Sequence, residues 1–422
     1  MTMLSSIEQR LSVHIPDLIS QWRTSTSGKH SVSGSLPQAL SEKEIQHAGT
    51  ALLALQRGLT GSRQLAGAGY MDDSALLGAY LLYYWPVSYM QVSLAASSAP
   101  EPFRTVIGNA EKAQRFLRIL DLGSGPGPAS AAVSDYIHYL QPAIRTDLTL
   151  TDASEKALAL AQGILQKHAD DRAYSSIMHT VAADIEQYAP KTDSATAGYD
   201  IIVMSHALNE LWRSKQDCIS KRAALLKEIS LHLIPGGMLF IIEPALLETS
   251  RSLLAVRNAL CADGFSVLSP CMGSIPCPAL SAGPSHTCHA EISWSPVEPV
   301  ASLAKQAGLD RESVKMSYCI IQPKQDIHTL SAAPQQTIRA KVVSDGMLNK
   351  SGRIRFLLCD GRERFAFSAK NGDATAKTQG FFSLRRYDTV EIENAEIRGT
   401  PEQTAFGFSA KTKLRIVSRI GE

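Results

Sequence analysis

The sequence predicts an α/β protein in three parts: a helical segment, a central parallel sheet covered by helices, and a small β-barrel at the C-terminal end. Three observations support this. Short apolar runs alternate with helical patterns over residues 105–262, a glycine-rich loop joins one apolar run to a helix, and strand-like runs return after residue 336. At 422 residues, 44% of them apolar and 19% charged, the chain is long enough for two or three globular domains.

Residues 1–104 are expected to form a helical segment. Apolar residues recur at three- and four-residue spacing in 51–59 and 73–94, which is the pattern of helices with a buried face. An aromatic cluster in the second stretch ends at Pro86. The simplest interpretation is a helical layer packed on the domain that follows.

Residues 105–262 are expected to form a Rossmann-like domain, because strands that alternate with helices build a parallel sheet buried on both faces. The expected strands are 116–122, 147–151, 181–184, 200–204 and 238–243, and the expected helices are 128–140, 154–168 and 221–233.

Two further parts complete the chain. Residues 263–335 are rich in Pro, Ser, Gly and Cys and form a cysteine-rich insertion. Residues 336–422 contain about five short alternating runs, typical of a small OB-like β-barrel. This last part has 16 basic and 10 acidic residues, so the overall charge of +2 hides a basic C-terminal domain.

Seven cysteines, an odd number, argue against a disulfide framework and favour a reducing compartment. No apolar run is long enough to suggest a membrane span. The first residues lack the basic patch, apolar stretch and cleavage site of a secretory signal, and Glu8 and Asp17 interrupt the pattern of a transit peptide.

The clearest motif is the glycine loop that follows the first predicted strand. It reads Asp121-Leu-Gly123-Ser-Gly125-Pro-Gly127-Pro, and it opens a helix. Glycines allow a tight turn and a close approach of ligand to backbone, while the helix N-terminus offers unpaired N–H groups. A nicotinamide fingerprint would place its third glycine at position 128, which is proline. The acidic residue before the loop suits a ligand with a positive amino-acid end.

Two further carboxylates end the next two predicted strands. Asp152 is placed to accept from ribose hydroxyls, and Asp184 from an adenine amino group. Together with Asp121, Gly123 and the rest of the glycine loop, they resemble the class I S-adenosylmethionine-dependent methyltransferase pattern over residues 105–260. Alternatively, the loop is a plain strand-to-helix turn and each aspartate is a helix N-cap.

No residue is assigned a catalytic role. The Asn/Asp-Pro-Pro-aromatic tetrapeptide with which many amino-methylating enzymes hold their acceptor is absent after the fourth predicted strand. His206 stands there instead and could act as a general base, although such a residue more often packs or caps the next helix.

Four cysteines suggest a metal site. Cys271, Cys277, Cys288 and Cys359 have the spacing C-x5-C-x10-C-x70-C in or after a loop rich in Pro and Gly. Thiolates suit zinc or an iron–sulfur cluster, and zinc sites usually carry cysteine pairs two to four residues apart. The loose spacing fits a cluster better, His286 and His289 leave zinc open, and buried free thiols are the plain alternative.

Read together, the segments resemble the methyltransferase-like family of bacteria and mitochondria that is associated with the small ribosomal subunit. The resemblance covers roughly residues 75–370, and it depends on the order of the motifs. They are the segment 79–89, the glycine loop, Leu208-Asn209-Glu210, Ile242-Glu243-Pro244, Pro270-Cys271, Cys277-Pro278, Cys288-His289 and Ser317-Tyr318.

The resemblance implies an iron–sulfur cluster, expected as 4Fe–4S, with zinc as the alternative. Its ligands fall on Cys271, Cys277, Cys288 and Cys359. Cys319 lies where members usually carry an aliphatic residue, so it is left outside the ligand set.

The resemblance also implies a function: an S-adenosylmethionine-dependent methyltransferase-like protein of the small ribosomal subunit, acting on or near rRNA in ribosome assembly or translation. The alternatives are a non-catalytic iron–sulfur assembly factor and a small-molecule or protein methyltransferase with structural zinc. Expected partners are small-subunit RNA and proteins, with no membrane. RNA is expected to meet basic residues and the aromatic side chains of Phe381, Phe382 and Tyr387. A monomer is expected, in the cytoplasm of a bacterium or the mitochondrial matrix of a eukaryote.

Overall fold

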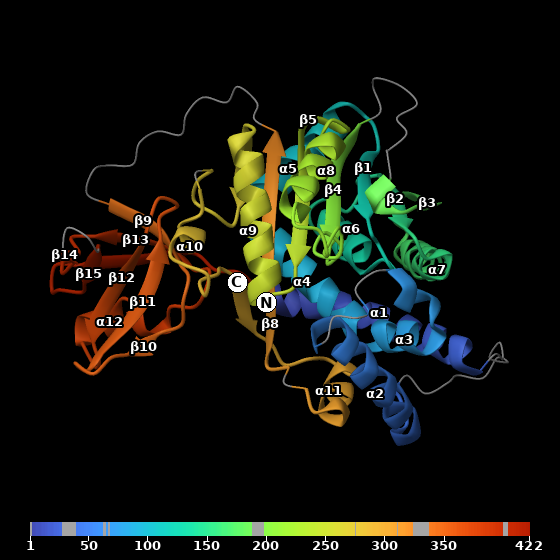
Figure 1. The fold of residues 1–422 in the computed structure, drawn as a ribbon, viewed down its shortest axis with the longest axis horizontal. Coiled ribbons are helices and arrows are strands. Elements are labelled where there is room, and N and C mark those ends of the chain that lie inside the picture. Colours follow the sequence, from blue (N-terminus) through green and yellow to red (C-terminus); the bar gives the residue numbers. More distant parts are fainter. Residues whose placement is uncertain are drawn as a thin grey trace. The chain divides into compact units, whose positions relative to one another are not determined.

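The computed structural model describes residues 2–27, 39–61, 65, 68–187, 198–274, 276–309, 311–323, 337–399 and 404–422. The chain divides into two compact units (Figure 1). Unit 1 comprises Met1–Glu243 and Ser293–Val314, and unit 2 comprises Pro244–Ile292 and Lys315–Glu422.

Unit 1 begins with helices, as the sequence predicts. They are α1 (Met3–Ser27), α2 (Glu42–Gln56), η1 (Arg57–Gly61), η2 (Ala68–Asp72), α3 (Ser74–Ala79), η3 (Tyr80–Tyr84), α4 (Trp85–Ser97) and α5 (Pro100–Lys112). Helix α2 starts at a capping box formed by Ser41 and Glu44. Helix α4 is buried on all sides and packs against α1 and α6 (Pro128–Leu140), which explains why its sequence lacks the polar face of a surface helix.

The parallel strands of unit 1 have the order β3-β2-β1-β4-β5. They are β1 (Leu117–Leu122), β2 (Thr146–Asp152), β3 (Ser176–Ala182), β4 (Tyr199–Ser205) and β5 (Leu233–Glu243), and the other helices of the unit are α6, α7 (Glu155–Arg172), η4 (Ile185–Gln187), α8 (Cys218–Ser230) and α11 (Val300–Ala307). Strands β1 and β4 are almost wholly buried, while the edge strand β3 is largely exposed. The strand order reverses between β1 and β4, which is where open α/β sheets bind ligands.

The five strands and three helices predicted here are confirmed, with shifted ends. Strand β3 begins earlier than predicted, at Ser176. Strand β5 begins at Leu233 and includes the Pro-Gly-Gly segment that was predicted as a turn. In this segment the register of its pairing with β4 shifts, between Tyr199 and Ile201, so the turn residues mark an irregularity within the strand.

Unit 2 contains helix α9 (Leu247–Ala262), helix α10 (Pro278–Ser281) and strands β6 (Phe265–Ser269), β7 (Ala290–Ser293) and β8 (Ser313–Pro323). Strand β6 runs antiparallel to β8, and β7 also pairs with β8. The loops between these elements carry three of the four cysteines predicted as ligands.

A second, mainly antiparallel sheet completes unit 2, in the order β14-β15-β12-β11-β9-β13-β16 with β10 beside β11. Its elements are β9 (Thr337–Val342), β10 (Met347–Leu348), β11 (Arg353–Cys359), β12 (Arg364–Lys370), α12 (Ala374–Thr378), η5 (Phe381–Ser383), β13 (Thr389–Glu393), β14 (Glu396–Ile397), β15 (Ala405–Gly407) and β16 (Lys413–Ser418). Its core is aromatic, with Phe356, Phe367 and Phe381 buried in edge-to-face contact. Within the described residues no pairing joins β14 to β16, so the second sheet is confirmed and closure into a barrel stays a prediction.

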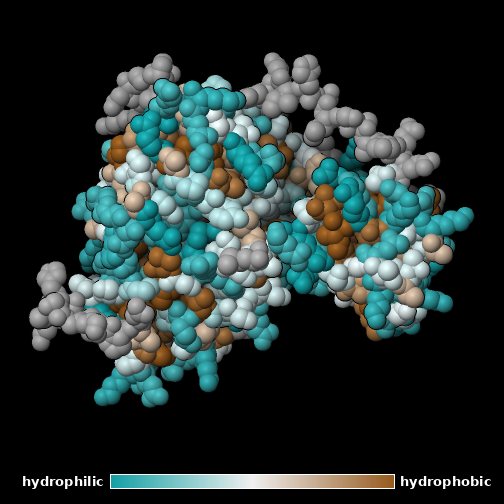
Figure 2. Space-filling view, turned by 180° about the vertical axis from the view of Figure 1, so that it is seen from behind, coloured by the Kyte–Doolittle hydropathy of each residue, from teal (hydrophilic) through white to brown (hydrophobic). Residues whose placement is uncertain are grey.

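The boundaries predicted at 104, 262 and 335 also stay predictions. None of the helices that the structure describes is long and apolar enough to cross a membrane. The face drawn in Figure 2 is largely hydrophilic, with apolar residues visible between polar ones.

Candidate functional site

The glycine loop between β1 and α6 has the backbone that the sequence predicts. Gly123, Gly125 and Gly127 have φ values of 70°, 51° and 80°, in the left-handed region that favours glycine. A Cβ added at Gly123 would lie 2.6 Å from the Cβ of Ala207 in the loop after β4. The loops after β1 and β4 therefore touch at the point where the strand order reverses.

Asp121 near the end of β1 is a buried carboxyl group with one open oxygen. Its Oδ2 accepts from the backbone N (3.1 Å) and the hydroxyl (2.7 Å) of Ser130. Its Oδ1 is buried and has no hydrogen-bond partner within the described part of the chain. Burial raises the pKa of this group to about 7. A cationic or N–H donor ligand beside the glycine loop would satisfy that oxygen.

Asp152 at the end of β2 holds the glycine loop. Its Oδ2 accepts from the backbone N of Gly125 at 2.8 Å, and its Oδ1 from that of Ser154 at 2.9 Å. Burial raises its pKa. Each carboxylate oxygen keeps a second lone pair, so the predicted contact with ribose hydroxyls is compatible with these bonds and stays a prediction.

Asp184 lies two residues beyond β3 and is exposed. Its Oδ1 accepts from the backbone N of Glu186 at 2.9 Å, so the side chain caps the short helix η4. The capping role, one of the two alternatives that the sequence left open, is thus present, and the predicted adenine contact stays a prediction.

Sequence reasoning missed that the segment η2 lies across the glycine loop. A Cβ at Gly125 would approach the Met71 methyl to 3.4 Å. The hydroxyl of Ser154 donates to Oδ1 of Asp72 at 2.7 Å, and Lys156 donates to the Asp72 carbonyl at 2.6 Å. A single Ala-Gly-Tyr-Met-Asp stretch has no periodic pattern, so no signal in the sequence placed it there.

The loop after β4 is tied down by buried polar groups. Nε2 of His206 lies 2.8 Å from Oε1 of Gln91, and burial lowers the pKa of His206 to about 4. Oε1 of Glu243, at the end of β5, accepts from the backbone N of Asn209 at 3.1 Å, and burial raises the pKa of Glu243 to about 8. An imidazole of such low basicity, already bonded to Gln91, is a weak general base.

The four cysteines predicted as ligands converge in unit 2. Cys271 follows β6, Cys277 precedes α10, Cys288 precedes β7, and Cys359 ends β11. All four line one cavity of about 50 Å³ and are free of disulfides. One water-sized sphere needs roughly 10–15 Å³ of such space, so the cavity has room for a group of several atoms.

The backbone around this cavity is closely packed. A Cβ at Gly361 would lie 3.1 Å from the backbone N of Gly273, so the turn after Cys359 meets the loop after Cys271. Helix α9 holds the same loop, because Arg257 donates to the Gly273 carbonyl and Asn258 accepts from the backbone N of Cys277 at 3.0 Å. The hydroxyl of Tyr387 lies 3.3 Å from Sγ of Cys288.

The chemistry of the cavity suits an anionic thiolate-bound group. Burial raises the pKa of Cys271 to about 12 and of Cys359 to about 11, so the thiols are neutral without a cation. Three cationic side chains, Arg257, Lys341 and Arg364, line the same cavity. The described lining includes neither His286 nor His289, so the donor set there is sulfur.

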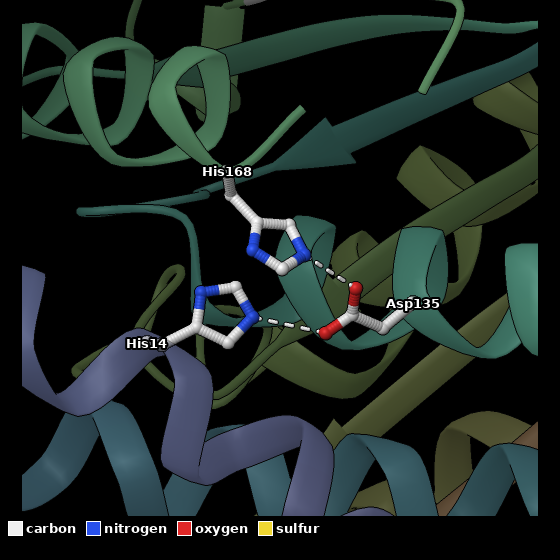
Figure 3. Close-up of side chains that lie close together, drawn as sticks. All are labelled: His14, Asp135 and His168. Atoms are coloured by element: carbon white, nitrogen blue, oxygen red, sulfur yellow. Dashed lines mark hydrogen bonds and ion pairs between the residues drawn. The ribbon is translucent and has the colours of Figure 1, made fainter. Parts of the chain in front are cut away.

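A second polar cluster lies inside unit 1, and it was not predicted from the sequence. Figure 3 shows Asp135 of α6 between His14 of α1 and His168 of α7. Nε2 of His14 lies 2.9 Å from Oδ2, and Nε2 of His168 lies 2.7 Å from Oδ1. The Tyr89 hydroxyl donates to Oδ2 at 2.6 Å.

A carboxylate only accepts, so each of these Nε2 atoms carries a hydrogen and donates it. The three side chains could offer ligand atoms to a cation, since these atoms lie within 4.8 Å of one another. Three donors already satisfy Asp135, however, and the cluster is a hydrogen-bonded network that fixes α1 to α6 and α7.

The parallel sheet with its strand-end glycine loop and carboxylates defines an α/β protein of Rossmann-like topology, and unit 2 adds a cysteine-lined cavity. The chain belongs to the family described as the mitochondrial small ribosomal subunit Rsm22, whose model matches residues 91–377, more than half of its length. This confirms the family resemblance stated from the motifs. No curated protein sequence matches the chain.

Among solved structures, the plantazolicin methyltransferase BpumL is 13% identical, with 67% of this chain and 99% of that chain covered and a TM-score of 0.32. A precorrin-6y C5,15-methyltransferase from Geobacter metallireducens GS-15 is 15% identical, with coverage of 53% and 87% and a TM-score of 0.29. An S-adenosylmethionine-dependent methyltransferase from Clostridium acetobutylicum ATCC 824 is 10% identical, with coverage of 75% and 89% and a TM-score of 0.24. Likenesses at these scores carry no further inference.

Proposed function

We propose that this protein is a factor of the small ribosomal subunit that binds S-adenosylmethionine in unit 1, holds an iron–sulfur cluster in unit 2, and acts on or next to rRNA during ribosome assembly or translation. The observation that carries the proposal is the family match over residues 91–377, which covers both the glycine loop and the four cysteines. The site of action would be the cytoplasm of a bacterium or the mitochondrial matrix of a eukaryote.

The proposed cofactor site is the group of strand ends around the glycine loop. Asp121 presents an open buried oxygen suited to the amino group of the ligand, and the N-terminus of α6 presents backbone N–H groups. Asp152 would accept from the ribose, and Asp184 lies at the same edge of the sheet for the adenine. The protein would position the sulfonium and exclude water, because positioning supplies most of the rate of a methyl transfer.

The proposed metal site is the cavity lined by Cys271, Cys277, Cys288 and Cys359. Four thiolates that line one cavity suit a 4Fe–4S cluster, and a single zinc ion is the alternative. The cations that line the cavity would balance the negative charge of a thiolate-bound group. When bound, such a cluster would hold together loops from distant parts of unit 2, in a structural role.

RNA would meet the exposed basic side chains of the second sheet. Arg355, Arg362, Lys370 and Lys411 are exposed and have no acidic partner within the described residues, so they are available to phosphates. The expected stacking of bases on Phe381 and Tyr387 is wrong, because both side chains are buried in unit 2. Phe382 is half-buried, so stacking of a base on it stays a prediction, and contact through phosphates carries the proposal.

A second candidate is a non-catalytic assembly factor, and one observation favours it. His206, the one general base suggested by the sequence, is bonded to Gln91 and has a pKa of about 4. Asp121→Ala would separate the two functions. Loss of S-adenosylmethionine binding with normal subunit assembly supports the non-catalytic factor, and defective assembly or loss of an rRNA methyl group supports the enzyme.

The proposal is tested by mapping RNA crosslinks of the tagged protein in cells. We expect enrichment of small-subunit rRNA, reduced at least fivefold when the four exposed basic residues of the second sheet are replaced by Gln. The matched control replaces four exposed basic residues of unit 1, Lys43, Lys112, Arg172 and Lys215, and should keep the enrichment. Absence of small-subunit rRNA from the wild-type crosslinks would contradict the proposal.

A further inference from the structure

The cysteine cavity of unit 2 holds a thiol that the predicted ligand set leaves out. Cys319 lies on β8, is 3% exposed, and lines the same cavity as Cys271, Cys277, Cys288 and Cys359. Sequence reasoning set it aside because of its position relative to the family motifs. In the structure Cys319 lines the cavity together with the four predicted ligands.

The register of β6 and β8 brings Cys319 close to the loop of the first predicted ligand. The last pair of these antiparallel strands is Ser269 with Ile320, so Cys319 is one residue from that pair on β8 and Cys271 is two residues from it along the chain after β6. Both residues line the same cavity.

We propose that Cys319 is a reserve ligand of the metal group in this cavity, able to replace Cys271 when that bond is broken or absent. The proposal rests on the iron–sulfur site proposed above. In the exchange, the Cys319 thiol gives its proton to solvent and forms a sulfur–iron bond, while the released Cys271 thiolate takes up a proton. No oxidant or reductant is needed, because each sulfur stays at the oxidation level of a thiol.

The plain alternative is that Cys319 is a small buried residue that packs on the strand and nothing more, which is common for free cysteines. Packing and ligation differ in what happens when Cys271 is removed. A packing residue leaves three ligands and a weakened site, whereas a reserve ligand restores the fourth.

The experiment compares iron and acid-labile sulfide per chain in full-length proteins purified without oxygen. The variants are Cys319→Ala, Cys271→Ala, the double variant Cys271→Ala/Cys319→Ala, and the control Cys271→Ala/Cys218→Ala, which removes a thiol of unit 1 instead. We expect Cys319→Ala to match the wild type. Cys271→Ala and the control should keep more than half of the wild-type iron, and Cys271→Ala/Cys319→Ala should fall at least fivefold.

Equal iron loss in Cys271→Ala and in the double variant would overturn the reserve ligand. A wild type without iron would overturn the cluster itself, and the reserve ligand with it, so the two failures are distinguishable. Cys319→Ala keeps all four predicted ligands, and it gives a second readout if Cys271→Ala does not fold. Its iron should pass to an added chelator at least three times faster than wild-type iron, and an equal rate would count against the proposal.

Discussion

The two candidate sites are built in opposite ways. The glycine-loop site of unit 1 lies where neighbouring strands end, and its carboxylates are bonded to the backbone: Asp121 to Ser130, and Asp152 to Gly125 and Ser154. The cavity of unit 2 gathers thiols that lie up to 88 residues apart in the sequence, from Cys271 to Cys359. Of these residues Cys277 is buried and the other three are half-buried, and, apart from Cys288, they make no hydrogen bond from the thiol to a side chain that the structure describes.

This difference shows which site depends on its ligand. The parallel sheet fixes the ends of its strands whether or not a ligand is bound, and the network around Asp135 fixes α1 to the same unit. The cysteines of the cavity come from distant parts of unit 2, so a metal bonded to all four would supply much of the order of the loops that carry them. Unit 1 should therefore keep its structure without cofactor, and unit 2 should lose stability without metal.

The largest expected effect is the loss of metal from unit 2. Replacing Cys277 by Ala should lower the free energy of unfolding of unit 2 by several kcal/mol, since binding free energy of a structural metal is folding free energy. Calorimetry should show the transition of unit 2 at lower temperature and that of unit 1 unchanged. The control Cys218→Ala, in unit 1, should leave both metal content and the unit 2 transition as in the wild type. If chelation of the wild type leaves both transitions in place, the metal is not what holds unit 2.

A change of similar size in unit 1 should come from its own polar network. Asp135→Asn removes the negative charge and replaces one of the two acceptor oxygens by an NH2 donor. At least one of the hydrogen bonds from His14, His168 and Tyr89 is therefore lost, and breaking a buried pair of this kind costs roughly 3 kcal/mol. Chemical denaturation should show unit 1 destabilised with the metal content of unit 2 unchanged. A loss of metal in this variant would contradict the expectation that the metal content of unit 2 is independent of the stability of unit 1.

Ligand binding at the glycine loop should be weakened by a single methyl group added at Gly123. Gly123→Ala would place a Cβ 2.6 Å from the Cβ of Ala207, in addition to the strain of a positive φ. We expect S-adenosylmethionine binding to weaken more than tenfold by calorimetric titration. Gly308→Ala is the matched control, because Gly308 has a φ of 64° and open space around its Cα. Equal effects of the two substitutions on binding would show that strain, and not the crowded loop, is the cause.

The smallest expected effect is a pH dependence of cofactor binding. Burial raises the pKa of Asp121 to about 7, so the carboxylate that pairs with a ligand ammonium is the minor form at pH 6. Binding should therefore tighten roughly eightfold between pH 6 and pH 7.5, as the competent form becomes dominant. Asp121→Asn should bind weakly with a flat profile over this range. A wild-type profile that is also flat would remove Asp121 from the ligand contact.

The sequence predicted the features that depend on residues close together in the chain, and it did not predict the contacts between distant residues. The strands, the glycine loop and the aspartates that end β1 and β2 were predictable, because period and motif are local features of the sequence. The placement of η2, with Met71 and Asp72, across the glycine loop was not predictable, because a short helix without periodicity leaves no pattern in the sequence. The network of His14, Asp135 and His168 was not either, because its members come from three helices and share no spacing.

The cysteine site falls between these cases. Spacing indicated a thiolate cluster, and the convergence of Cys271, Cys277, Cys288 and Cys359 on one cavity agrees with that interpretation. The part played by Cys319 depends on the antiparallel register of β6 and β8, which no count along the chain provides.

The most direct test of this account is the metal content of the wild-type protein purified without oxygen. The account predicts about four irons and a similar amount of acid-labile sulfide per chain, bound by unit 2. A protein with one zinc, or with no metal and an unchanged unfolding transition of unit 2, would contradict it.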